Sequence, residues 1–411
     1  MSRAQRIEHC RACGFAGLTE VLHLGHLALP GTFPQPGAPV DREPLTLGVC
    51  GRCNLLQLEH LYDDRVFFER DYGYRSGLNS AMKAHLESLV QDLVERFPLR
   101  AGDTVIDIGA NDGTLLRSLP LNTRQIAIDP GMARYVPYYD GHKPKYLALV
   151  TGYFPEVSIP CLPGQARLIT SIAMFYDVRA PLDFMRVIRD LLSLDGIWYC
   201  EQQYAGNLIE SLAYDSICHE HACYYGLRQL VMLGESAGLK IIDVSFNPSN
   251  GGSIGVVFSR SDSKYEPYQA LPMLLHREAK ILSPEAIASF SSRVLKHIRE
   301  LHDFIEKLVS VDRKTVYALG ASTKGNIILQ LSLLGFYVAG IGEINPDKFG
   351  CVTPGTNIPI VPESYVLEHV NAGYLLILPY HFRDGFIERT AEYVKYGGKL
   401  IFPLPTLEVY P

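Results

Sequence analysis

The chain has 411 residues, 47% of them hydrophobic and 20% charged, with a formal net charge of −6. This length exceeds what a single hydrophobic core supports, so we expect two or three globular domains. The acidic balance argues against a nucleic-acid-binding protein, and no apolar run is long enough to span a membrane. No signal-like apolar segment follows the first residues, so we expect a cytoplasmic protein whose nine cysteines are metal ligands or buried thiols.

A zinc-binding module is predicted at residues 1–75. Four cysteines form two Cys-X-X-Cys pairs, Cys10 with Cys13 and Cys50 with Cys53. Two such turns supply four thiolates to one tetrahedral Zn²⁺ and leave no open position, which indicates a structural site. Four reduced buried thiols are the alternative, and His9 or His23 could replace a cysteine. The segment between the pairs is expected to be a long loop that packs on another part of the chain.

Residues 76–262 are predicted to form a doubly wound α/β domain. A helix over residues 79–97 precedes an apolar strand at 105–108, a glycine turn with a helix start, and a strand at 126–129. The glycines let the backbone approach a ligand, Asp112 is placed to cap the new helix, and Asp129 can bind both ribose hydroxyls. The turn lacks the third glycine of the dinucleotide fingerprint and carries an Asn-Asp pair. This suits the cationic, phosphate-free S-adenosylmethionine, and therefore predicts a methyltransferase.

Further strands are expected at residues 167–172, 196–201, 240–246 and 252–259, with helices at 181–194 and 227–237. Ligands of such sheets bind beyond the carboxyl ends of the strands, which also places Glu201 at the crevice. The predicted cofactor-binding residues are Asp107, Gly109, Ala110, Asn111, Gly113, Asp129, Pro130 and Met174.

A histidine-rich segment, residues 218–225, follows the strand that ends at Glu201. His219 and His221 flank Glu220, and together they offer a base near neutral pH and a carboxylate to orient it. A zinc site built with Cys218 and Cys223 is an alternative, although this spacing does not converge easily on one ion. Histidines without chemistry are the other alternative.

Residues 263–411 are predicted to contain a helical connection and a second α/β domain. The stretch from Arg260 to Asp312 is expected to be helical, with Ser283 as a helix cap before a proline. A strand from residue 314 then leads into a glycine turn that carries Ser322, Thr323 and Lys324, a combination suited to phosphate. Further strands are expected at 338–345, 374–379 and 399–404. A unit that serves only as a scaffold is the alternative.

These motifs together resemble the nucleotide-sugar C-methyltransferases of deoxysugar pathways, and the resemblance runs almost end to end. It implies a zinc-binding module, a class I methyltransferase (Rossmann-like) domain and a second Rossmann-like α/β domain. The matching motifs are the two cysteine pairs, Tyr72-X-Tyr74-X-Ser76, Asp107 to Gly113, His219-Glu-His221 with Tyr224-Tyr225, Asn250-Gly-Gly-Ser253, Gly320-X-X-X-Lys-Gly-Asn326 and Pro354 to Pro359.

The resemblance implies methylation at C3 of a 4-keto nucleotide sugar, commonly linked to dTDP, through an enolate. His221 is then the base, assisted by Glu220 and His219, and Tyr72 or Tyr74 lies near the enolate oxygen. The chain departs from the family pattern at Asp177, where relatives carry histidine, and at Cys218, where they carry tyrosine. The expected substrate-binding residues are Asp177, Tyr224, Ser253, Ser322, Lys324 and Asn326.

Two other functions stay open at this point. The same scaffold could methylate a different acceptor, such as a sugar oxygen, a nitrogen or a non-sugar ketone. A zinc-containing scaffold protein that has lost activity is the less favoured hypothesis, because the set of Asp107, Gly109 and Asp129 is intact. Since no exposed apolar stripe is evident, we expect a monomer. From the acidic charge and the lack of a long apolar run, we expect that it binds neither nucleic acid nor membrane.

Overall fold

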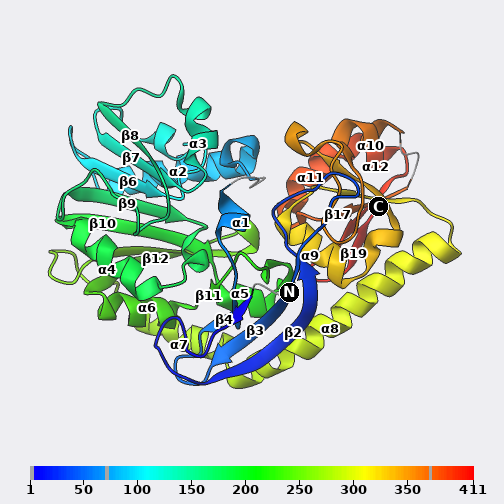
Figure 1. Cartoon of the computed structure of the whole chain (residues 1–411), viewed down its shortest axis with the longest axis horizontal. Helices are drawn as coiled ribbons and strands as arrows, with labels where there is room; N and C mark the ends of the chain where they lie inside the picture. Colours follow the sequence, from blue (N-terminus) through cyan, green and yellow to red (C-terminus); the bar gives the residue numbers. More distant parts are fainter. Residues whose placement is uncertain (1–3, 70–73, 370–372) are drawn as a thin grey trace.

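The computed structural model describes residues 4–69, 74–369 and 373–411. Two α/β units lie side by side, and a long N-terminal hairpin and a long helix run along the bottom of both (Figure 1). No helix within these described ranges is long and apolar enough to cross a membrane.

The doubly wound sheet predicted for the central domain is confirmed. Among the described residues its strand order is β12-β13-β10-β9-β6-β7-β8, parallel except for β13, which is antiparallel to both of its neighbours. The strands are β6 (Thr104–Ile108), β7 (Arg124–Asp129), β8 (Tyr146–Thr151), β9 (Ala166–Ile172), β10 (Leu192–Gln203), β12 (Leu239–Asn247) and β13 (Ser253–Arg260).

Helices cover both faces of this sheet, which explains why β6 is a continuous buried run rather than an alternating one. Each helix turns an apolar stripe inward, as α4 does with Phe184, Ile188 and Leu191. The side chain of Asn79 caps α2 by accepting from the amides of Ala81 and Met82. The helices of this domain are α2 (Ser80–Arg96), α3 (Met132–Tyr135), α4 (Pro181–Leu191), α5 (Ala205–Glu210) and α6 (Leu227–Ser236).

Two details of the prediction for this domain are wrong. The glycine turn does not lead into an α-helix but into a single short 3₁₀ turn, Leu116–Ser118, because Pro120 holds Leu119 in an extended conformation. Asp112 therefore caps no helix, and its carboxylate accepts from the Thr114 hydroxyl and the Gly77 amide instead. Strand β8 was also not predicted.

The second α/β unit is confirmed as a sheet that is parallel except for its last strand. Its strand order in the described part of the chain is β16-β15-β14-β17-β18-β19. The strands are β14 (Val316–Leu319), β15 (Val338–Glu343), β16 (Ile360–Pro362), β17 (Tyr374–Ile377), β18 (Lys399–Phe402) and β19 (Glu408–Tyr410). Its helices are α9 (Thr323–Leu331), α10 (Glu363–His369), α11 (Arg383–Arg389) and α12 (Ala391–Lys395).

Two helices connect the units, α7 (Leu271–Ile281) and α8 (Pro284–Glu306). Ser283 caps α8 as predicted, since its hydroxyl accepts from the Ala286 amide at 3.2 Å. The prediction of helix throughout residues 260–312 is wrong at its start. Residues 261–270 form turns, and Pro267 disfavours helix at the residue before it.

The predicted loop between the cysteine pairs is also wrong. These residues form a long antiparallel hairpin, β2 (Leu18–Ala28) and β3 (Arg42–Cys50). The hairpin belongs to a sheet of order β11-β4-β3-β2, whose other strands are β4 (Leu56–Leu58) and β11 (Cys223–Tyr224). Around it lie β1 (Gln5–Arg6), β5 (His60–Leu61) and α1 (Arg65–Phe68).

The hairpin joins two hydrophobic cores. Its leucines, among them Leu22 and Leu45, are buried in the core that also contains the apolar side of α8 and the C-terminal sheet. The cysteine end, with Cys10 and Cys50, belongs to the core of the central domain. The N-terminal segment is therefore a brace across both α/β units.

Candidate active site and metal centre

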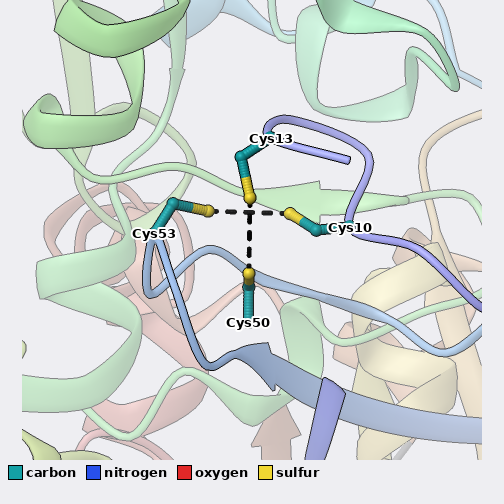
Figure 2. Close-up of side chains that lie close together, drawn as sticks. All are labelled: Cys10, Cys13, Cys50 and Cys53. Atoms are coloured by element: carbon teal, nitrogen blue, oxygen red, sulfur yellow. Dashed lines mark hydrogen bonds between the residues drawn. The ribbon is translucent and has the colours of Figure 1, made fainter. Parts of the chain in front are cut away.

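The two cysteine pairs fold into turns with the same hydrogen bonding. The Gly14 amide donates to the Cys10 carbonyl at 2.9 Å, and the Asn54 amide donates to the Cys50 carbonyl at 3.0 Å. Gly14 and Asn54 each directly follow the second cysteine of their pair, and both residues have a positive φ. Because the turns are equivalent, all four sulfur atoms point at one centre (Figure 2).

The spacing of these sulfur atoms fits a zinc ion. Cys10 Sγ lies 3.6 Å from Cys53 Sγ, Cys13 Sγ lies 3.6 Å from Cys50 Sγ, and all four atoms lie within 4.8 Å of one another. Zn–S bonds of about 2.3 Å in a tetrahedron place sulfurs roughly 3.8 Å apart. His23 is not a substitute ligand, since its Nδ1 pairs with the Thr46 hydroxyl. The four cysteines form a closed structural zinc site.

The glycine turn after β6 forms the cofactor crevice. Gly109 has a φ of +74°, and a Cβ at this position would lie 3.1 Å from Cγ of Met174. Only glycine therefore lets the backbone pass this side chain without displacing it. Asp129, at the end of β7, accepts from the amides of Asn111 (3.0 Å) and Gly131 (2.7 Å).

The two acids of this crevice are buried. Burial raises the pKa of Asp107 to about 7, although the Thr170 hydroxyl donates to it at 2.7 Å and opposes the shift. Burial also raises the pKa of Asp129, against the two backbone amides that favour its charged form. A buried carboxylate at the end of the second strand fits the ribose of a nucleoside cofactor.

One cavity of about 1400 Å³ joins the crevice to the C-terminal domain. This volume exceeds that of a usual pocket for one small molecule, so it can hold a cofactor and an acceptor together. The predicted site residues that line it are Tyr74, Asp107, Gly109, Ala110, Asn111, Asp129, Pro130, Met174, Asp177, Glu220, His221, Ser322 and Lys324.

His221 has a fixed tautomer. Its Nδ1 lies 2.9 Å from the carbonyl oxygen of Ser216, which can only accept, so Nδ1 carries the proton and Nε2 keeps its lone pair. The ring packs against Tyr176, with centroids 4.2 Å apart. Burial, together with the charge of Lys324, lowers the pKa of His221 to about 3. The imidazole is thus neutral and able to accept a proton.

The carboxyl group of Glu220 lies beside this imidazole. A Glu220 oxygen, a His221 nitrogen and Cys218 Sγ lie within 4.8 Å of one another. Burial raises the pKa of Glu220 to about 8, with a hydrogen bond from Thr323 opposing the shift. Burial and the nearby charge of Glu220 raise the pKa of Asp177 well above its usual value. Glu220 is therefore protonated near neutral pH and can donate a hydrogen bond.

Tyr74 is held at the cavity by the glycine turn. Asn111 Nδ2 donates to the Tyr74 carbonyl at 3.2 Å, and Asn111 Oδ1 accepts from the Ser76 amide at 3.1 Å. The Tyr74 side chain is 40% exposed at the mouth of the cavity, and its hydroxyl, whose pKa desolvation raises, keeps its proton near neutral pH and is a donor. Tyr72, the other tyrosine of this motif, lies outside the described residues.

Several predicted site residues do not line the cavity. His219 Nε2 lies 3.1 Å from the Glu43 carbonyl and its ring packs edge-on against Tyr62, so this histidine joins the segment to the N-terminal module. Tyr224 donates to the same Ser216 carbonyl that holds His221. The other predicted residues outside the cavity are Gly113, Ser253 and Asn326. Glu201, which was expected at the crevice, forms a hydrogen bond with His85. The alternative zinc site with His219 and Cys223 is not assembled among the described residues.

The second glycine turn repeats the geometry of the first. The Gly320 amide donates to the Gly342 carbonyl, just as the Gly109 amide donates to the carbonyl of Ile128. Glu343, at the end of β15, accepts from the Ala321 amide at 2.9 Å, as Asp129 does from Asn111. The prediction missed Glu343, although an acid at the end of the second strand was the signal used for Asp129.

Lys324 and Ser322 meet the cavity at the start of α9. The Ser322 hydroxyl caps α9 by accepting from an amide of the first turn. Lys324 Nζ donates to the Asn250 carbonyl at 2.8 Å, and burial lowers the pKa of this lysine. The prediction also missed Gly31 and Phe33, which line the cavity from the tip of the hairpin. These two carry no chemical signal in the sequence.

Comparison with known proteins gives matches along almost the whole chain. Residues 10–68 match the profile of a zinc binding domain, residues 82–244 a methyltransferase domain, and residues 248–405 the C-methyltransferase C-terminal domain. The chain is 30% identical to the C-methyltransferase NovU of Streptomyces niveus over 411 residues, which covers 97% of this chain and 96% of that protein.

Two solved structures each match 43% of the chain. A S-adenosylmethionine-dependent methyltransferase from Clostridium acetobutylicum is 11% identical, with a TM-score of 0.37, and covers 43% of this chain and 92% of its own. A SAM-dependent methyltransferase from Aquifex aeolicus is 15% identical, with a TM-score of 0.34, and covers 43% and 97%.

Proposed function

Because the chain belongs to the C-methyltransferase family and is an S-adenosylmethionine-dependent class I methyltransferase with a structural zinc site, we propose that it methylates C3 of a 4-keto nucleotide-linked deoxysugar. The observation that carries this proposal is the composition of the cavity of about 1400 Å³. It contains the cofactor crevice, the fixed imidazole of His221 and the second glycine turn.

The hard step in such a reaction is removal of a proton from carbon. His221 suits this task because Nε2 has a free lone pair and Nδ1 is anchored to Ser216. In the proposed reaction Nε2 takes the proton from C3, and the electron pair of that C–H bond forms the enolate of the 4-ketone. When bound, S-adenosylmethionine supplies the electrophilic methyl group, and the enolate carbon forms the new bond as the sulfonium becomes a thioether. A positioned base contributes roughly 10²–10⁴-fold to such a rate.

Donors for the enolate oxygen lie in the same cavity. The pKa values of the Tyr74 hydroxyl and the Glu220 carboxyl are both raised, so both groups keep their protons near neutral pH. Donors fixed before the reaction stabilise developing negative charge without reorganisation. We propose that these two residues donate hydrogen bonds to the enolate oxygen and that Asp177 binds a hydroxyl of the sugar.

The nucleotide part of the acceptor is proposed to bind at the C-terminal turn. Ser322, Lys324 and the free amides at the start of α9 suit phosphate oxygens. Glu343 occupies the position in this unit that Asp129 occupies in the other, which suits a ribose hydroxyl. Each α/β unit would thus bind one nucleoside.

The test is a methyl-transfer assay with labelled S-adenosylmethionine and dTDP-linked 4-keto-6-deoxy sugars, followed by mass and NMR analysis of the product. The proposal expects a methyl group on C3, next to the ketone. A methyl group on oxygen or nitrogen would contradict the enolate, and cofactor binding without transfer to any keto sugar would contradict the acceptor class. Cytoplasmic location and a monomeric state stay predictions.

A further inference from the structure

The tip of the N-terminal hairpin reaches the reacting end of the cavity. Gly31 lies against the side chain of Glu220, and a Cβ at Gly31 would lie 2.4 Å from Glu220 Oε1 and 3.9 Å from the Thr323 hydroxyl. Glu220 Oε1 is fully buried and has no hydrogen-bond partner among the described residues. Glycine is therefore the residue that covers this oxygen without displacing it.

The tip is fixed to the C-terminal domain at several points. The Ala28 amide donates to Gln330 Oε1 at 2.7 Å, and Gln330 Nε2 donates back to the Ala28 carbonyl at 3.2 Å. Further along, the Val352 amide donates to the Pro34 carbonyl at 2.9 Å. The Lys348 ammonium lies 4.6 Å from the centre of the Phe33 ring. These contacts fix the position of the tip backbone relative to the C-terminal domain, and therefore relative to Glu220.

The carboxyl of Glu220 thus lies where three parts of the chain meet. Its own segment comes from the central domain, Thr323 at the start of α9 donates to it from the C-terminal domain, and Gly31 covers it from the N-terminal module. Among the described residues no donor forms a hydrogen bond with Oε1, so the position of this oxygen is limited by packing.

We propose that the hairpin tip, Gly31 to Phe33, is the third wall of the acceptor site and that Gly31 positions the Glu220 carboxyl beside His221. This rests on the proposed function, since Glu220 is there a donor to the enolate oxygen. It gives the zinc module a part in catalysis, because the hairpin that carries the tip begins and ends at the cysteine pairs.

Gly37 offers a matched control in the same hairpin connection. Gly31 and Gly37 both have φ in the left-handed region, +87° and +80°, so alanine strains the backbone at both positions. A Cβ at Gly37 meets nothing within 4 Å. The difference between G31A and G37A therefore isolates the contact with Glu220 from the backbone strain.

The first experiment uses thermal unfolding of the zinc-loaded full chain and needs no substrate. G31A is expected to lower Tm more than G37A does. The additional lowering of Tm in G31A should vanish in an E220A background, because the carboxyl that the new Cβ would contact is absent there. Equal Tm values for G31A and G37A, or an excess that persists in E220A, would overturn the contact.

The second experiment measures steady-state kinetics and S-adenosylmethionine affinity. G31A should lower kcat by about 100-fold, the order that a misplaced catalytic group costs, with the cofactor Kd unchanged. E220D, which shortens the side chain, should restore part of that loss in G31A. Wild-type kcat in G31A would refute the positioning role. Absence of methyl transfer by the wild type would instead reject the proposed function, and the unfolding experiment would still decide the contact.

Discussion

At the scale of single residues, His221 is distinguished by its hydrogen bond rather than by its residue type. H221A should lower kcat by roughly 10²–10⁴-fold because the proton acceptor is lost. The cofactor Kd should not change, since the cofactor crevice is formed by the turn at Gly109 and by Asp129. Isothermal titration with S-adenosylmethionine and steady-state kinetics measure the two quantities.

A matched control for this substitution is H276A, at an exposed position on α7. It should leave both quantities at the wild-type level. A large loss of cofactor affinity in H221A would contradict its assignment as the base.

The carboxyl of Glu220 gives a second prediction, on pH. Because burial raises its pKa to about 8, Glu220 donates a hydrogen bond below that pH and loses the proton above it. The value of kcat/KM should therefore fall as pH rises through about 8. No acidic fall is expected from His221, whose pKa is lowered to about 3.

E220Q keeps a donor in this place and has no proton to lose. The alkaline fall should therefore be absent from its profile, measured as kcat/KM between neutral and alkaline pH. An unchanged fall in E220Q would assign the titration to another buried group of the cavity, such as Asp177.

The sequence predicted most of the residues that were expected in the site and that line the cavity, but it did not predict the directions of their side chains. His219 and His221 are equivalent in sequence, but one faces the Glu43 carbonyl and the other faces the cavity. A difference of two positions in a tight turn reverses the direction of a side chain, and no pattern of residue types records that direction. Tyr224 similarly supports Ser216 from outside the cavity.

At the scale of elements, the sequence predicted those with a strong local signal. Strands β6 and β7 and the capped helix α8 agree with their predictions because apolar runs and capping residues are local features. The β2–β3 hairpin was predicted as a loop, although Leu45, Leu47 and Val49 alternate with smaller or polar residues in the manner of a half-buried strand.

Helix α8 gives a prediction of its own. S283A removes the side-chain acceptor for the Ala286 amide and should lower the free energy of unfolding by about 1 kcal/mol. S292A, in the exposed middle of the same helix, is the control and should not destabilise. Denaturant unfolding measures both, and equal stabilities would contradict the role of the cap.

At the scale of the whole molecule, the zinc site holds the N-terminal brace. C10S should lose zinc and lower Tm, because a structural zinc site adds its binding free energy to folding. Methyl transfer should fall with it, since the hairpin tip lines the cavity. Metal analysis, thermal unfolding and the transfer assay give the three readouts.

The control is C161S, whose thiol lies outside the cysteine cluster. It should retain zinc and Tm. A folded and fully active C10S without zinc would contradict the structural assignment.

The brace also sets an order of events during synthesis. The hairpin leaves the ribosome early, yet β4 pairs with Cys223–Tyr224, and Ala28 bonds with Gln330, separated from it by 302 positions. The hairpin is thus made well before all of its partners are available. Until residue 330 has emerged, Leu22, Leu45 and their neighbours lack the core that finally buries them, and the nascent chain must keep this apolar hairpin from other contacts.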